Sequence, residues 1–187
     1  MSCYSRIRRQ QLILEAEGYL DLILAASDVL PMEPRHRTCL ANRAIGVLDQ
    51  LEYEEFDNGR PEYLRGQAYR LMNEHSRAID ALLKAAEADP ANTHIHLALA
   101  WCYKRIGRLN LAIESLEDAL EIDPGRGILH YNLACYWSLT NNVGLTLAHM
   151  AKAFEFNADY RTLVSDESDF DPVRHHPEFL ALTDVIV

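Results

Sequence analysis

The sequence predicts an all-α fold made of stacked antiparallel helix pairs. Two Asp-Pro pairs, Asp89-Pro90 and Asp123-Pro124, lie 34 residues apart. Each pair ends a stretch in which small and aromatic residues recur at the same offsets, and a period of about 20 to 50 residues is typical of a stacked array of repeats. Because proline prevents a helix from continuing, each pair also marks a helix end.

Composition and charge are typical of a soluble globular protein of the cytoplasm. Of 187 residues, 49% are hydrophobic and 25% are charged, which is ordinary for a folded domain. The formal net charge of −10 is spread evenly along the chain, so nucleic acid is not expected as a ligand. Acidic residues interrupt the apolar run near the N-terminus, and we expect neither an export signal nor a membrane span. The four cysteines form no CxxC pair, which indicates reduced, buried thiols.

An N-terminal helical extension is expected over residues 1–58. Residues 8–30 are predicted to form a long helix, because apolar residues recur on one stripe at helical spacing. A second apolar face of this helix holds Leu14, Leu22 and Leu24. Pro31 and Pro34 then break the chain, and a helix over about residues 36–55 repeats the apolar spacing of the units that follow it. This segment indicates a degenerate leading repeat with a lengthened first helix.

Three units of 34 residues are in register, at residues 59–92, 93–126 and 127–160. Each is expected to contain two antiparallel helices, A and B. Small residues at positions 8 and 27 let the two helices approach closely, and an aromatic side chain at position 11 fills the space beside them. Asparagine or glycine at position 15 tolerates the left-handed conformation that ends a helix. Position 8 holds Gly66, Ala100 and Ala134, and position 11 holds Tyr69, Tyr103 and Trp137. Position 15 holds Asn73, Gly107 and Asn141, and position 27 holds Ala85, Ala119 and Ala153.

Residues 161–187 are predicted to form a C-terminal cap of short helices. Pro172 and Pro177 suit the first turn of a helix, and Asp171 is a suitable cap for the helix that follows it. The apolar residues of this segment are expected to cover the exposed side of the last repeat, as the end of a stacked array requires. They are Phe170, Val173, Phe179, Leu180 and Leu182.

The repeated pattern resembles the tetratricopeptide repeat family from residue 59 to about residue 158. That family has a helix-turn-helix signature of about 34 residues, with small residues at positions 8, 20 and 27, an aromatic at position 11 and proline at position 32. The resemblance implies a right-handed superhelical solenoid whose concave surface binds other proteins. The chain departs from the pattern at Arg65, where leucine is usual, and at Thr146 and Ala158, where alanine and proline are usual.

No pattern of residues predicts catalysis, a cofactor or a metal ion. His96 and His130 occupy equivalent repeat positions, at which tryptophan is common in the family, so we expect them to share a packing role. His175 and His176 lie near two aspartates of the cap, but their spacing is not that of paired metal ligands. The sequence contains neither a phosphate-binding loop nor a nucleophile elbow. We therefore expect a protein that is not an enzyme and has no cofactor.

The resemblance implies a binding strip on helix A, at positions 2, 5, 9 and 12 and beside them at position 6. Aromatic side chains of the strip are typical anchors of a protein interface, and its cations are concentrated on one surface of an acidic protein. The strip is therefore expected to bind a peptide or helix with apolar anchors and some negative charge, with Trp101 at its centre. The predicted residues are Arg60, Tyr63, Gln67, Arg70, His94, Leu97, Trp101, Lys104, Tyr131, Asn132, Cys135 and Ser138.

The favoured function is a non-catalytic adaptor or scaffold, and several alternatives stay open. A small acidic protein with three repeats also resembles the secretion-type chaperones of the family. The surplus apolar face of residues 8–30 favours a scaffold that forms homo-oligomers, or a helix that folds back and occupies the groove itself. Binding of a chaperone's C-terminal carboxylate is disfavoured, because only Asn132 and, in part, Arg60 fit that clamp. A metal-dependent enzyme that uses the histidines of the cap is the weakest alternative.

Overall fold

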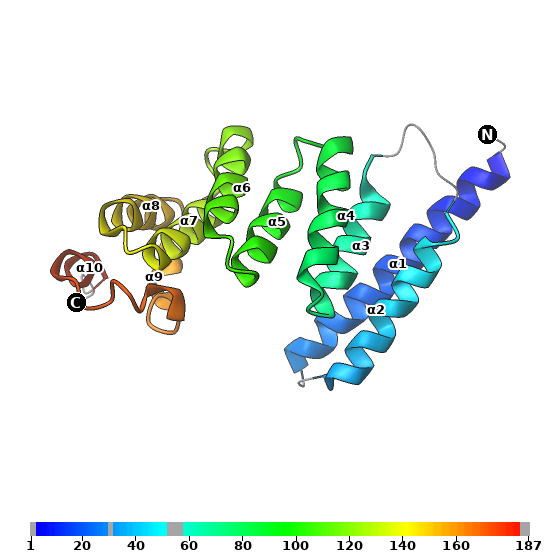
Figure 1. Cartoon of the computed structure of the whole chain (residues 1–187), viewed down its shortest axis with the longest axis horizontal. Helices are drawn as coiled ribbons and strands as arrows, with labels where there is room; N and C mark the ends of the chain where they lie inside the picture. Colours follow the sequence, from blue (N-terminus) through cyan, green and yellow to red (C-terminus); the bar gives the residue numbers. More distant parts are fainter. Residues whose placement is uncertain (1–2, 30–31, 52–57, 184–187) are drawn as a thin grey trace. The chain divides into compact units, whose positions relative to one another are not determined.

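The chain folds into helix pairs, as the sequence predicts. The computed structural model describes residues 3–29, 32–51 and 58–183, and helix is the only regular secondary structure within these ranges (Figure 1). Contacts divide the chain into two compact units, unit 1 (Met1–Cys102) and unit 2 (Tyr103–Val187). Across the described ranges, no helix combines the length and the apolar character that a membrane crossing needs.

Unit 1 begins with α1 (Cys3–Val29) and α2 (Pro34–Leu48), two antiparallel helices that lie side by side (Figure 1). Of the stripe predicted for α1, Leu12, Ala16, Leu20 and Ile23 are buried in one core with residues of α2 and α3. Tyr19 and Ala26 of the stripe are partly buried, and Leu30 lies outside the described residues. Helix α1 begins five residues before the predicted start, and α2 ends at Leu48 although a longer helix was expected. Residues 52–57 of that expected helix lie outside the described residues.

The second apolar face of α1 is not buried. Leu14, Leu22 and Leu24 are 56%, 52% and 49% exposed, whereas Leu20 and Ile23 of the first stripe are buried. Because one face of a helix is enough to attach it to a core, α1 is held in unit 1 while this second face remains at the surface.

The first repeat of unit 1 is the pair α3 (Arg60–Leu71) and α4 (His75–Ala88), followed by α5 (Thr93–Arg105), within which the unit boundary falls. A Cβ atom added to Gly66 of α3 would lie only 2.6 Å from Cγ of Leu82 in α4. The two helices therefore approach closely at position 8, which explains the small residue there.

Unit 2 continues with α6 (Leu109–Ile122), α7 (Gly127–Leu139) and α8 (Val143–Phe156). The alanines at position 27 of the second and third repeats, Ala119 and Ala153, are fully buried. Every helix A ends as predicted, because Asn73, Gly107 and Asn141 have φ values of 61°, 75° and 58°. This left-handed conformation is favourable for glycine and tolerated by asparagine.

Histidine at position 4 has the shared structural role that its repetition predicts. His96 donates a hydrogen bond from Nε2 to the carbonyl oxygen of Pro90 at 3.0 Å, and His130 donates the same bond to Pro124 at 3.3 Å. The second bond leaves Nδ1 of His130 as an acceptor for His149, 3.1 Å away. Burial lowers the pKa of His130. Burial also lowers the pKa of His149, and the neighbouring His130 ring lowers it further, to about 4. Both rings are therefore neutral at pH 7.

Arg65, the departure from the family pattern in the first repeat, forms ion pairs instead of packing as leucine would. Its guanidinium group lies 3.2 Å from the carboxylate of Glu62 and also contacts the carboxylate of Asp49, just after α2. Arg65 thus ties the first repeat to the leading helix pair of unit 1.

The cap consists of α9 (Tyr160–Leu163), the short 3-10 helix η1 (Ser168–Phe170) and α10 (Pro177–Thr183). Phe170, Val173 and Phe179 are buried, as predicted, but Leu180 is 40% exposed. Arg174 holds the turn around η1 in place by donating hydrogen bonds to the carbonyl oxygens of Val164, Ser165 and Glu167 at 2.7 to 3.2 Å. The cap is therefore an ordered segment organised by one arginine, which the sequence did not identify.

Candidate binding groove

An open pocket of about 560 Å³ lies in unit 1, between α1, α3 and the start of α5. Five residues of the predicted strip line it, and their positions follow from helix A geometry, because positions 2, 5, 9 and 12 share one side of a helix. They are Arg60, Tyr63, Gln67, Arg70 and His94. The structure thus brings the first part of the predicted strip to one accessible site.

Helix α1 forms one wall of this pocket and does not fill it. Glu17, Leu20, Asp21 and Leu24 line the pocket from α1, and Glu17 forms an ion pair with Arg60 of α3. The sequence did not assign these four residues to the site. The only available signal was the second apolar face of the helix, to which Leu24 belongs.

Arg70 is a cation of the pocket that has no acidic partner among the described residues. Its guanidinium carbon lies 5.3 Å from the centre of the Trp101 ring, a cation–π distance. Within the described residues, Arg70 forms no ion pair, and its buried Nε has no hydrogen-bond acceptor. The pocket is therefore lined by a positive charge that lies beside an aromatic ring and is not compensated by a carboxylate of the described residues.

Trp101, the expected central anchor, is half-buried and is not among the residues that line the pocket. Its ring contacts Arg70 on one side, and the ring of His75 meets it edge-on with 5.2 Å between centroids. Leu97 is likewise half-buried. In this structure the Trp101 ring lies beside Arg70, and its role as the central anchor stays a prediction.

The cap covers the predicted strip in unit 2. Tyr131, Cys135 and Ser138 are 5%, 2% and 0% exposed. Tyr131 stacks on Tyr160 of the cap at 5.1 Å and meets Phe170 edge-on at 5.8 Å. These three residues were expected to face a partner, but in this structure all three are buried, and Tyr131 and Cys135 lie against the cap. Burial also raises the pKa of the Tyr131 hydroxyl.

Two further residues of the strip in unit 2 have partners within the chain. Lys104 forms an ion pair with Asp169 of η1, and its ammonium nitrogen lies 5.6 Å from the centre of the Tyr136 ring. Asn132 donates a hydrogen bond from its amide to the carbonyl oxygen of Ile128 at 2.9 Å. Lys104 is thus paired with the cap and Asn132 with its own helix, and their contact with a partner protein stays a prediction.

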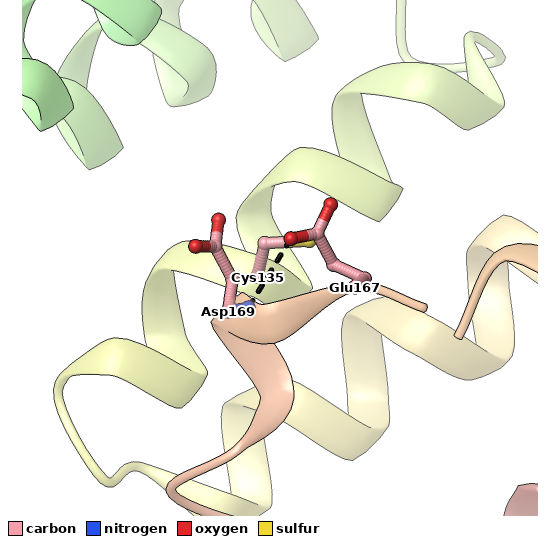
Figure 2. Close-up of side chains that lie close together, drawn as sticks. All are labelled: Cys135, Glu167 and Asp169. Atoms are coloured by element: carbon pink, nitrogen blue, oxygen red, sulfur yellow. Dashed lines mark hydrogen bonds between the residues drawn. The ribbon is translucent and has the colours of Figure 1, made fainter. Parts of the chain in front are cut away.

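Figure 2 shows that Cys135 of α7 meets Glu167 and Asp169 of the cap. The possible metal-ligand atoms of these three side chains lie within 4.8 Å of one another, and the backbone N–H of Asp169 donates to Glu167 at 3.1 Å. Burial, together with the two carboxylates, raises the pKa of the Cys135 thiol, so the sulfur stays protonated. Lys104 supplies the positive charge that the carboxylates need, and the cluster attaches the cap to α7.

The metal candidate raised by the sequence does not assemble. Among the described residues, Cys135, Glu167 and Asp169 form the one group of three close donors. Asp171 instead accepts a hydrogen bond from Nε of Arg174 at 3.0 Å. His175 and His176 therefore do not join the cap aspartates in a metal-binding group. Of the cysteines with described side chains, Cys102 and Cys135 are buried, but Cys39 is exposed.

Comparisons with known proteins agree with this architecture. Residues 69–134 match the tetratricopeptide repeat family, while no curated protein sequence matches the chain. The solved structure "MamA MSR-1 C2" is 21% identical, with a TM-score of 0.58 over 85% of this chain and 99% of that one. YrrB, described as a tetratricopeptide repeat protein with an unusual peptide-binding site, is 18% identical, with a TM-score of 0.61 over 81% of this chain and 72% of that one. Residues 69–134 are therefore similar to the tetratricopeptide repeat family, and the chain has the all-helical solenoid fold of these solved structures.

Proposed function

We propose that this protein is a non-catalytic interaction scaffold that binds a peptide or helix of another protein in the pocket of unit 1. The observation that carries the proposal is the open pocket itself, which lies on the side of helix A that the repeat pattern assigns to binding. Its volume of about 560 Å³ falls in the range typical of ligand sites. Tetratricopeptide repeats are in general interaction scaffolds, and YrrB, with a similar fold, is described as having a peptide-binding site.

The pocket suits a partner that places one anchor side chain into it while its backbone follows the surface of α3. Tyr63 and Leu24 offer apolar surface on opposite walls, and Gln67 offers an amide for polar contacts. Because all three lie on helices whose packing is fixed by the core, the receptor loses little conformational freedom on binding. A preformed site of this kind favours affinity without requiring a large interface.

Leu24→Glu is expected to weaken peptide binding by about tenfold or more, because it replaces an apolar contact of the pocket by a third acidic side chain on the α1 wall. Random peptides displayed on phage would be selected on the full-length protein, and the enriched peptides would then be measured by fluorescence anisotropy. Leu22→Glu is the matched control, since Leu22 is equally exposed on α1 but does not line the pocket. Equal affinity of wild type and Leu24→Glu, or no enriched peptide, would contradict the proposal.

A specific observation also favours a second function, self-association through α1. The side chains of Ile7, Leu14 and Leu22 are each more than half exposed, and they follow one another at a spacing that keeps them on one side of the helix. Charges are segregated along α1, with Arg6, Arg8 and Arg9 in its first turns and Glu15, Glu17 and Asp21 from its middle onward. Antiparallel pairing with a second copy would place opposite charges side by side.

If α1 mediates self-association, Leu22→Glu is expected to lower the particle mass to that of a monomer, because a buried carboxylate at an apolar interface is strongly unfavourable. Light scattering of the full-length protein measures this mass. Leu24→Glu is here the control with unchanged mass. A monomeric wild-type protein would exclude the second function and leave the pocket proposal untouched.

A further inference from the structure

Position 12 of helix A carries a cation in both of the first two repeats, Arg70 in unit 1 and Lys104 in unit 2. The two cations have similar aromatic neighbours. Arg70 lies 5.3 Å from the ring centre of Trp101, and Lys104 lies 5.6 Å from that of Tyr136. They differ in their acidic partner, since Lys104 contacts the carboxylate of Asp169 and Arg70 has none among the described residues.

The partner of Lys104 shows how this surface of the fold accommodates an acidic segment. Asp169 is only 8% exposed, and the next residue, Phe170, is fully buried with its ring against Tyr131. A carboxylate and an adjacent aromatic side chain thus dock together on helices A of unit 2. The segment belongs to the cap, yet its contacts are those expected of a bound peptide.

We infer that the pocket of unit 1 recognises an acidic side chain, Asp or Glu, beside an aromatic or large apolar residue of the partner. This inference rests on the proposed function and specifies its ligand. The carboxylate binds the guanidinium group of Arg70, which lines the pocket and has no acidic partner among the described residues, and a charge-assisted bond of this type is stronger than a neutral one. Tyr63 and Leu24 receive the neighbouring apolar side chain.

The other charges of the pocket are compatible with one ligand carboxylate. Glu17 is neutralised by its ion pair with Arg60. Asp21 is exposed on the α1 side of the pocket, where it disfavours a second acidic residue. A single ligand carboxylate is therefore bound most favourably at Arg70, because the charge of Arg70 is not compensated within the described part of the chain.

The test uses the full-length protein and random peptides displayed on phage. Enriched peptides are expected to carry Asp or Glu next to an aromatic or large apolar residue, and Arg70→Gln is expected to weaken their binding about tenfold or more. Arg77→Gln is the matched control, because Arg77 also lies over an aromatic ring, that of Tyr69 at 4.1 Å, but outside the pocket. Its affinity is expected to match wild type.

Two additional measurements keep the result independent of folding. Replacing the acidic residue of the best peptide by its amide should cause the same loss on the wild-type protein and little further loss on Arg70→Gln. In a Trp137→Phe background, Trp101 is the sole tryptophan, and its fluorescence should change when the acidic peptide binds.

Enriched peptides that lack an acidic residue, or that bind Arg70→Gln as tightly as wild type, would overturn the inference while the pocket proposal stands. Failure to enrich any peptide would count against the pocket and hence against both.

Discussion

Replacing Ala119 by arginine is expected to lower the free energy of unfolding by about 4 kcal/mol or more, because overpacking and an unpaired buried charge both act at this site. Ala119 is fully buried in α6, at position 27, where the repeat pattern requires a small side chain. Since a typical domain is stable by only about 5 to 15 kcal/mol, the variant should be largely unfolded or much less stable. Urea unfolding followed by circular dichroism measures the change.

Ala151→Arg provides the matched control for this experiment. Ala151 lies in the middle of α8 in the same unit but is exposed, so the same substitution should alter stability by less than about 0.5 kcal/mol. A folded Ala119→Arg protein with an unshifted midpoint would mean that the assigned repeat register is incorrect.

Phe170→Ala is expected to destabilise unit 2 by about 3 to 5 kcal/mol, the usual cost of removing a buried phenylalanine ring. Phe170 is fully buried and contacts Tyr131 of α7 and Phe179 of α10, with 5.8 and 5.5 Å between ring centroids. Loss of its ring should loosen the cap and expose Cys135. Both effects are measurable, the first by urea unfolding and the second by the rate at which a thiol reagent labels Cys135 in mass spectrometry.

Leu163→Ala is the control for the cap. Leu163 also belongs to the C-terminal segment but is 50% exposed, so its truncation should cost much less and leave the labelling of Cys135 slow. If Phe170→Ala were as stable as wild type and Cys135 remained protected, the cap would not depend on Phe170, and the covered surface of α7 would need another explanation.

The repeats were predictable because each repeated position imposes a local physical requirement. Gly66 is needed where α3 and α4 approach, and Asn73, Gly107 and Asn141 adopt left-handed conformations that few other residues tolerate. Such requirements recur every 34 residues and therefore produce a repeated residue pattern in the sequence. The helix ends, the positions that require small side chains and the shared role of His96 and His130 could all be inferred from that pattern.

The cap's contacts with Lys104, Tyr131 and Cys135 of the binding strip could not be predicted, because they join distant parts of the chain. Lys104 and Asp169 are 65 residues apart, and no periodic pattern links them. The acidic run of residues 165–171 was visible, but its position over α7 depends on Phe170 and on the hydrogen bonds of Arg174. The wall that α1 adds to the pocket could not be predicted for the same reason, because Glu17 lies in the leading helix pair and Arg60 in the first repeat.

The bonds from His96 to Pro90 and from His130 to Pro124 have a consequence for how such a chain changes in evolution. Each bond joins residues only six apart, across the junction of two repeats. A gene duplication that copies residues 91–124 would therefore carry a complete junction with it, since the Pro124 of one copy would again precede a histidine by six residues. Simple duplication of one repeat would thus preserve this bond at every junction.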